Sequence, residues 1–265
     1  MNRPATDQPA AFSARDIDLE IDGRRILNQV SLDFGSGEIT SLVGHNGSGK
    51  SSLLKILARQ NKATAGRVLC AGQELDGFSS RDFARKVGYL QQDLGAGSGM
   101  TVRELVACGR YPWHGALGRF SDIDRRKVED ALALTHIEPL ADRPIETLSG
   151  GERQRAWIAM LMAQDTECLL LDEPTSALDI AHQIEVLSLV RRLSADRGLS
   201  VVIVLHDINM AARFSDRIHA LKNGEVVASG TPADILQTAT LRQIYGIDMD
   251  VTPHPSLNVP IAYVR

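Results

Sequence analysis

The sequence contains Gly44-His45-Asn46-Gly47-Ser48-Gly49-Lys50-Ser51, a full match to the phosphate-loop pattern G-x-x-x-x-G-K-[ST]. Residues Glu38 to Val43 before it are predicted to form a short buried strand, and Ser51 to Ala58 after it the start of a helix with apolar residues at helical spacing. A strand, a glycine turn and a helix N-terminus together form a cradle for anions. The backbone N–H groups point inward, and the helix dipole adds positive potential.

The residue types in this loop suit a bound nucleotide. Lys50 would reach the β- and γ-phosphates, and the Ser51 hydroxyl would ligate Mg²⁺. The alternative is a glycine-rich turn that binds nothing, which the flanking strand and helix disfavour. We therefore predict a phosphate site with contacts from Gly44, Asn46, Gly47, Ser48, Gly49, Lys50, Ser51 and Ser52.

The composition is that of a globular protein and narrows its possible partners. The chain has 265 residues, of which 43% are hydrophobic and 23% charged, with a formal net charge of -4. A negative net charge provides no basic surface for nucleic acid, which weakens DNA or RNA as the main partner without excluding it. The cysteines Cys70, Cys108 and Cys168 lack metal-ligand spacing, so we expect reduced thiols in a reducing compartment.

Two further patterns bear on location. The sequence has no apolar run of about 18 residues, so we expect no membrane span. Residues Met1 to Ala14 lack a charged start followed by an apolar core, so they do not form a secretory signal. We expect a soluble, cytoplasmic chain with a frayed N-terminal tail.

Patterns along the chain indicate a strand-rich core with an inserted block of helices. Alternating apolar residues between Ile17 and Phe34 predict strands joined by a turn. After the glycine-rich stretch from Asp93 to Met100, helical signals dominate from Thr101 to Ala163, beginning with a capping-box pattern. Continuous apolar runs at Cys168–Leu171 and Ser200–Leu205 predict parallel strands buried on both faces.

These patterns predict an α/β fold with one nucleotide-binding domain. The predicted boundaries are a flexible tail at 1–14, a domain at 15–248 with its core at 15–92 and 164–248 and its helical subdomain at 93–163, and a C-terminal tail at 249–265.

Four further motifs follow the phosphate loop along the chain. They are Leu148-Ser149-Gly150-Gly151-Glu152-Arg153-Gln154 at a helix start, Cys168 to Asp172 followed by Glu173, Ser176-Ala177-Leu178-Asp179, and His206 after a buried strand. In this order they resemble the signature, Walker B strand, D-loop and switch histidine of the ATP-binding cassette (ABC) family. The resemblance covers about residues 15 to 240. It implies a P-loop NTPase (RecA-like) core with an antiparallel β subdomain and an inserted α-helical subdomain, which hydrolyses ATP with Mg²⁺.

The polar residues after the predicted strands have separate chemical roles. Asp172, at the carboxyl end of a buried strand beside the phosphate loop, can hold Mg²⁺ through water, and Glu173 can accept the proton of an attacking water. The alternative for this pair is a helix N-cap, which the neighbouring loop disfavours. Gln92 matches the family's Q-loop glutamine, so we predict that it couples γ-phosphate and Mg²⁺ to the inserted helices. His206 is predicted to contact the γ-phosphate, although a lone histidine is usually a core residue.

A second anion site is predicted at Gly150-Gly151, where a helix N-terminus and the Ser149 hydroxyl come together. Unlike the phosphate loop, this site has no lysine of its own. Two such helix ends in one chain suggest a head-to-tail dimer. The resemblance implies that Ser149 and Gly151 of one copy contact the γ-phosphate held by the other. Asp179 is most simply an N-cap, and its family role is communication across the dimer interface.

The sequence departs from the family pattern at two positions. The family usually has an upstream aromatic residue that stacks on adenine, and the matching residue here is Ile21, which keeps an apolar contact but loses stacking. Gln91 stands where close relatives often carry proline. The first departure bears on the selectivity for the base.

Residues beyond the predicted Q-loop point to a class of transporter. The runs Met100–Val106 and Gly109–Gly115 resemble the ATPases of iron-siderophore, haem and vitamin B12 importers, and Arg110–Phe120 with Gln154–Met160 most resembles the ferric-hydroxamate (ferrichrome-type) branch. The alternative for the aromatic residues here is a small packed core. The resemblance implies a peripheral subunit at the cytoplasmic face of the bacterial inner membrane. Its implied partners are a second copy, two permease subunits and, indirectly, a periplasmic or surface substrate-binding protein.

Three other functions stay open at this point. A haem or vitamin B12 importer ATPase is the nearest alternative. A soluble ABC ATPase acting on DNA or ribosomes is disfavoured by the single phosphate loop and the short insertion. A non-hydrolysing clamp is disfavoured because Glu173 and His206 are both present.

Overall fold

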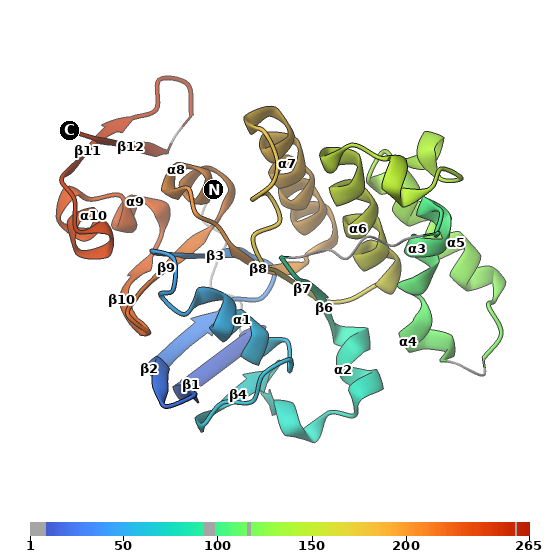
Figure 1. The fold of residues 1–265 in the computed structure, drawn as a ribbon, viewed down its shortest axis with the longest axis horizontal. Helices are drawn as coiled ribbons and strands as arrows, with labels where there is room; N and C mark the ends of the chain where they lie inside the picture. The colour runs from blue at the N-terminus through green and yellow to red at the C-terminus, as the bar shows by residue number, and fades with distance from the viewer. Residues whose placement is uncertain (1–8, 93–98, 116–117, 258) are drawn as a thin grey trace.

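Strands and helices alternate through most of the chain in this computed structural model, which describes residues 9–92, 99–115, 118–257 and 259–265 (Figure 1). In chain order the elements are β1 (Phe12–Ile21), β2 (Arg24–Phe34), β3 (Ile39–Val43), α1 (Lys50–Leu57), β4 (Ala65–Cys70), β5 (Gln73–Glu74), α2 (Ser80–Lys86), β6 (Val87–Leu90), α3 (Val102–Cys108), α4 (Tyr111–His114), α5 (Asp122–Leu134), α6 (Gly150–Gln164), β7 (Cys168–Leu171), α7 (Ile180–Arg197), β8 (Ser200–Val204), α8 (Ile208–Phe214), β9 (Arg217–Lys222), β10 (Glu225–Gly230), α9 (Pro232–Ile235), α10 (Thr238–Tyr245), β11 (Met249–Pro253) and β12 (Pro260–Val264). Short 3-10 helices lie at Leu75–Gly77, Glu138–Leu140 and Ile145–Thr147.

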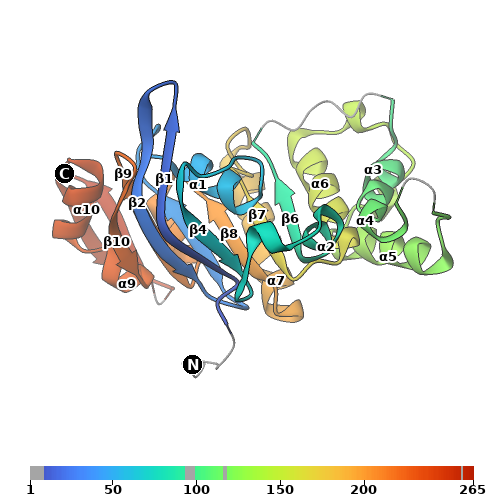
Figure 2. The same ribbon diagram turned by 90° about the horizontal axis from the view of Figure 1, so that it is seen from below.

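The central element is a six-stranded sheet with the order β10-β9-β3-β8-β7-β6. Its strands pair in parallel from β9 to β6, and β10 pairs with β9 in the antiparallel direction. A separate antiparallel sheet has the order β2-β1-β4-β5, and α1 lies between this sheet and the central one (Figures 1 and 2). This arrangement confirms the predicted α/β core with an antiparallel β subdomain.

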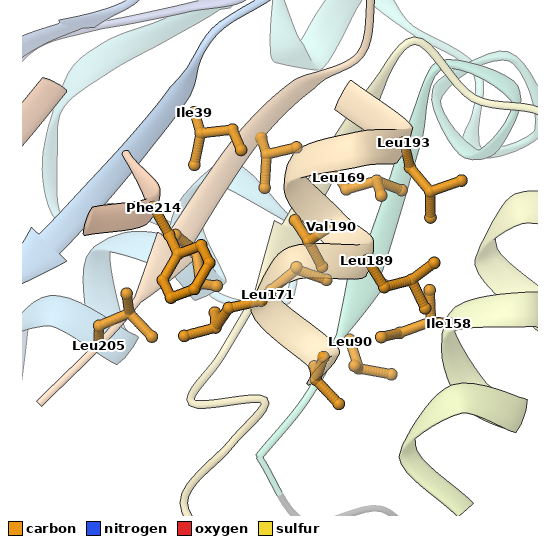
Figure 3. Packing of buried hydrophobic residues seen from close by; sticks show 14 of the residues in the cluster. Ile39, Leu90, Ile158, Leu169, Leu171, Leu189, Val190, Leu193, Leu205 and Phe214 are labelled. Carbon is orange, nitrogen blue, oxygen red and sulfur yellow. The ribbon is translucent and has the colours of Figure 1, made fainter. Parts of the chain in front are cut away.

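The central strands place alternate side chains into two cores, one on each face of the sheet. In β7, Leu169 and Leu171 pack in the core that contains α7, whereas Cys168 and Leu170 pack in the core that contains α1. Figure 3 shows Leu169 and Leu171 beside Val190 of α7. Burial on both faces explains why these strands are continuous apolar runs in the sequence.

The helices α3, α5 and α6 pack together at one end of the molecule, opposite α9 and α10 (Figures 1 and 2). Capping boxes begin each of them, with Thr101, Ser121 and Ser149 as the N-cap residues. The predicted inserted helical subdomain and the Thr101 capping box are therefore confirmed. Part of the predicted glycine-rich stretch, residues 93–98, lies outside the described residues. Within the described ranges, no helix combines the length and hydropathy needed to cross a membrane.

Both predicted tails contain strands, so the prediction of a flexible tail at 1–14 is wrong from Phe12 onward, and the C-terminal segment, whose structure the sequence left open, is a hairpin. β1 begins at Phe12, which is fully buried. Phe12 is paired with Phe34 in β2 on one side and with Cys70 in β4 on the other. At the other end, β11 and β12 form an antiparallel hairpin, and the Ala262 backbone exchanges two hydrogen bonds with the side chain of Asn209 in α8. Residues 1–8 of the predicted N-terminal tail lie outside the described residues.

A buried ion pair holds the helical subdomain together. Arg110 Nε donates to Asp124 Oδ1 at 2.8 Å, and Arg110 Nη1 donates to the carbonyl of Ala163 at 2.7 Å. The two charged side chains are only 4% and 6% exposed. This pair joins α5 and the end of α6 to the short segment before α4.

We predict that Asp124→Ala destabilises the folded chain by about 3–5 kcal/mol, because it leaves the Arg110 charge buried without its carboxylate partner. The matched control is Asp122→Ala in the same helix, whose pair with Arg125 is exposed and should cost about 0.5 kcal/mol or less. Urea unfolding monitored by circular dichroism measures both changes. Equal losses in the two variants would contradict the prediction.

The same carboxylate makes stability depend on pH. Burial raises the pKa of Asp124, but hydrogen bonds from Ser121 and Arg110 outweigh it and lower the pKa to about 2. The stabilisation is therefore fully present above the unfolded pKa of about 3.9, and it is lost as the pH falls through 2. Acid unfolding of the wild type should show this loss, and Asp124→Ala should lack it.

Candidate functional site

Four parallel strands end at the same edge of the central sheet, and a predicted site residue follows each of them. The phosphate loop follows β3, Gln92 follows β6, Asp172 and Glu173 follow β7, and His206 follows β8. Because the carboxyl ends of parallel strands meet at one edge, residues far apart in the sequence come together here.

Glycine is required in the phosphate loop for two different reasons. Gly44, Gly47 and Gly49 have φ values of 138°, 76° and 100°, in the region that side chains disfavour. A Cβ on Gly44 would also lie 2.0 Å from the carbonyl oxygen of Leu221 in β9, whereas a Cβ on Gly47 would meet nothing within 4 Å. A Cβ on Gly49 would lie 2.6 Å from Leu27 Cδ2 in β2, so close packing restricts Gly44 and Gly49, whereas backbone conformation alone restricts Gly47.

Lys50 lies inside the curve of the loop. Its ammonium group donates to the carbonyl oxygens of Gly44 at 2.9 Å and His45 at 2.8 Å. Burial lowers the pKa of Lys50, while the nearby charges of Glu173 and Asp172 raise it. The loop carbonyls thus hold the positive charge at the place where the predicted phosphates would bind.

Ser51 and Asp172 connect the loop to β7. Ser51 Oγ donates to Asp172 Oδ1 at 2.8 Å. Burial raises the pKa of Asp172, the hydrogen bond from Ser51 lowers it, and the charge of Glu173 raises it again. A hydroxyl and a carboxylate side by side are hard oxygen donors that suit Mg²⁺. In the described part of the chain, no three or more His, Cys, Asp or Glu residues gather into a metal site.

Glu173 is the centre of the polar cluster at this edge. Its Oε2 accepts a hydrogen bond from Gln92 Nε2 at 2.6 Å and lies 2.7 Å from His206 Nε2. The φ of Glu173 is 49°, an uncommon conformation for a residue with a side chain and a frequent one at functional sites.

Most of the site residues described above line a cleft of about 360 Å³. Its lining consists of Ile26, Asn46, Gly47, Ser48, Gly49, Lys50, Ser51, Ser52, Gln92, Glu173 and His206. The sequence did not identify Ile26 as a lining residue, although it lies within the strands predicted between Ile17 and Phe34. Ile21 is 44% exposed and is not among these lining residues. In this structure the apolar wall of the cleft is therefore Ile26, and the contact of Ile21 with adenine stays a prediction.

Gly44 and Asp172 are not among these lining residues, and Ser149, Gly151 and Asp179 form a second group outside the lining. Ser149 is the N-cap of α6 and accepts from the Glu152 N–H. Asp179 is the N-cap of α7, as its simplest interpretation predicted, and accepts from the backbone and ring of His182. A Cβ on Gly151 would lie 2.5 Å from His182, so the two helix starts are neighbours.

The comparisons with known proteins agree with this geometry. A family model described as ABC transporter matches residues 27–176. The iron(3+)-hydroxamate import ATP-binding protein FhuC of Bacillus subtilis (strain 168) is 42% identical over 95% of this chain and 93% of its own length. The achromobactin transport ATP-binding protein CbrD of Dickeya dadantii (strain 3937) is 41% identical over the same shares, 95% and 93%. Among solved structures, the dimeric structure of MJ0796, a bacterial ABC transporter cassette, has a TM-score of 0.72 at 29% identity and covers 83% of this chain and 98% of that chain.

We predict that Gly44→Ala destabilises the chain by at least about 3 kcal/mol, because strain at positive φ adds to the clash with the Leu221 carbonyl. The matched control is Gly47→Ala, which carries the strain alone and should cost about 1–2 kcal/mol. Urea unfolding measures both changes. If Gly47→Ala were as damaging as Gly44→Ala, the clash would not be the decisive term.

Proposed function

The chain belongs to the ABC transporter family, and from this premise we propose that it is the ATP-hydrolysing subunit that energises import of a ferric siderophore. The observation that carries the proposal is the position of Glu173 beside the phosphate loop, where it accepts a hydrogen bond from Gln92 and lies 2.7 Å from His206 Nε2. A carboxylate held in one orientation at the mouth of a phosphate site is placed to take a proton from water.

In the proposed mechanism, each group of this chain has a separate task. The phosphate loop N–H groups and Lys50 bind the phosphates of ATP and offset their charge. Glu173 accepts the proton of the attacking water, and the hydrogen bond from Gln92 and the contact with His206 keep its carboxylate in place. Ser51 and Asp172 would hold Mg²⁺, which supplies further charge neutralisation, and the free amide oxygen of Gln92 is a third donor of the right kind.

We propose that a second copy completes the site. Ser149 and Gly151 lie at the start of a 15-residue helix, outside the lining of the cleft. A helix N-terminus favours anions, so this end suits the γ-phosphate of ATP bound by another copy. The dimeric form of the similar cassette supports such a pairing. The proposed further partners are two permease subunits at the cytoplasmic face of the membrane and, indirectly, a substrate-binding protein.

The class of cargo rests on the relatives. Two relatives of nearly equal identity carry names that specify iron(3+)-hydroxamate import and achromobactin transport. The first name specifies a ferric hydroxamate, which supports a ferric siderophore as the cargo here. The run Arg110–Phe120 favours the hydroxamate type within that class.

We predict that Glu173→Gln lowers ATP hydrolysis at least about 100-fold while ATP binding persists, because only the proton acceptor is removed. The matched control is Glu167→Gln, whose surface pair with Lys86 should not affect turnover. Hydrolysis is measured with the purified chain alone, and again with its membrane subunits in lipid and a siderophore-loaded binding protein.

Two results would oppose the proposal in different ways. Full turnover by Glu173→Gln would remove Glu173 from the role of base. Turnover that ignores the membrane subunits but rises with DNA or ribosomes would replace the importer with a soluble ATPase.

A further inference from the structure

The second residue of the phosphate loop contacts the end of α10. His45 Nε2 lies 3.0 Å from the carbonyl oxygen of Tyr245, and the two rings meet edge to face with their centroids 5.6 Å apart. A carbonyl oxygen only accepts, so Nε2 carries the proton and donates. This contact joins residues 200 positions apart in the chain.

The acceptor end of this contact is firmly held. Leu241 and Ile244 of α10 are completely buried, and Lys222 Nζ donates to the carbonyl oxygen of Gln243 at 2.6 Å. The last carbonyl groups of a helix lack partners within the helix and carry negative potential, which favours an N–H donor there. The end of α10 is therefore a fixed acceptor for the His45 ring.

The backbone of His45 shapes the phosphate site itself. Its carbonyl oxygen accepts from Lys50 Nζ at 2.8 Å and from the Ser48 N–H at 3.1 Å. One residue thus holds α10 through its side chain and the phosphate-binding lysine through its backbone. A shift of the His45 peptide would displace Lys50 and alter the loop curvature at Ser48.

We infer that His45 is a positioning residue of the ATP site, which fixes the phosphate loop by tethering it to the carbonyl end of α10. The inference rests on the proposed function. It makes α10 part of the nucleotide site, although none of the sequence motifs for ATP includes that helix. The tether lowers the conformational freedom that the loop would lose on binding ATP, so its effect falls on affinity more than on turnover.

The test compares variants that separate the loss of the hydrogen bond from a change in side-chain volume. His45→Leu keeps an apolar side chain against Tyr245 but removes the donor, and it should raise the Kd for ATP about three- to fivefold, as expected for one hydrogen bond. His45→Gln keeps an N–H donor and should stay within about twofold of the wild type. Tyr245→Phe is the matched control, because the Tyr245 hydroxyl has no hydrogen-bond partner and the acceptor carbonyl is retained.

Two readouts separate positioning from folding. Isothermal titration gives the Kd together with the number of sites, so a misfolded fraction lowers the site number and not the affinity of the remainder. In the assembled transporter, His45→Leu should raise the KM for ATP by the same factor and leave kcat within about twofold.

The outcomes are distinct. A His45→Leu variant with wild-type Kd would overturn this inference, as would equal weakening by His45→Leu and His45→Gln. A wild-type chain that neither binds nor hydrolyses ATP would instead overturn the proposed function.

Discussion

One hydrogen bond of 2.8 Å, from Ser51 to Asp172, joins the first turn of α1 to the end of β7. It can form only because β3 and β7 run in the same direction on either side of β8, so that their carboxyl ends meet at one edge. A slip of β7 by one residue would turn Asp172 to the opposite face. Backbone hydrogen bonds at both ends of β7 oppose that slip, from the Glu167 N–H to the Lys86 carbonyl and from the Asp172 N–H to the Leu90 carbonyl. The register of β7 against β6 therefore determines which oxygen atoms face the phosphate loop.

The charges at this edge are balanced only in part by the protein. Burial disfavours the charged form of Lys50 and of Asp172, and the charge of Glu173 further raises the pKa of Asp172. The charges of Lys50 and Lys55 both act on Asp172 and offset the two carboxylates, but the phosphates of ATP would add negative charge that these lysines do not balance. A divalent cation next to Ser51 and Asp172 would relieve this repulsion. The charge distribution thus gives a physical reason for Mg²⁺ in the proposed reaction, independent of the family resemblance.

Features set by neighbouring residues were predictable from the sequence, and features set by distant partners were not. The phosphate loop and the Thr101 capping box depend on local spacing, and the structure matches them. The start of β1 at Phe12 depends on pairing with Phe34 and Cys70, and the C-terminal hairpin depends on Asn209 of α8, so neither carries a strong local signal. The apolar wall of the cleft could not be deduced for the same reason. Ile26 reaches the loop because β2 lies against it, whereas Ile21 lies at the end of β1.

The contacts of α4 determine how the helical subdomain can move against the core. Within the subdomain, the buried pair of Arg110 and Asp124 is expensive to break, at about 3–5 kcal/mol. Towards the core, Arg81 and Arg85 of α2 each donate to the carbonyl oxygen of Pro112, at 2.9 and 3.0 Å, from more exposed positions. Such hydrogen bonds contribute about 1 kcal/mol each. Both arginines also donate to the carbonyl oxygen of Trp113 at 3.4 Å. These bonds lie nearer to solvent and can break one at a time, whereas opening the buried pair would leave two charges desolvated. A movement that begins at Gln92 would therefore carry α3, α5 and α6 as one body, and with them the helix end that bears Ser149.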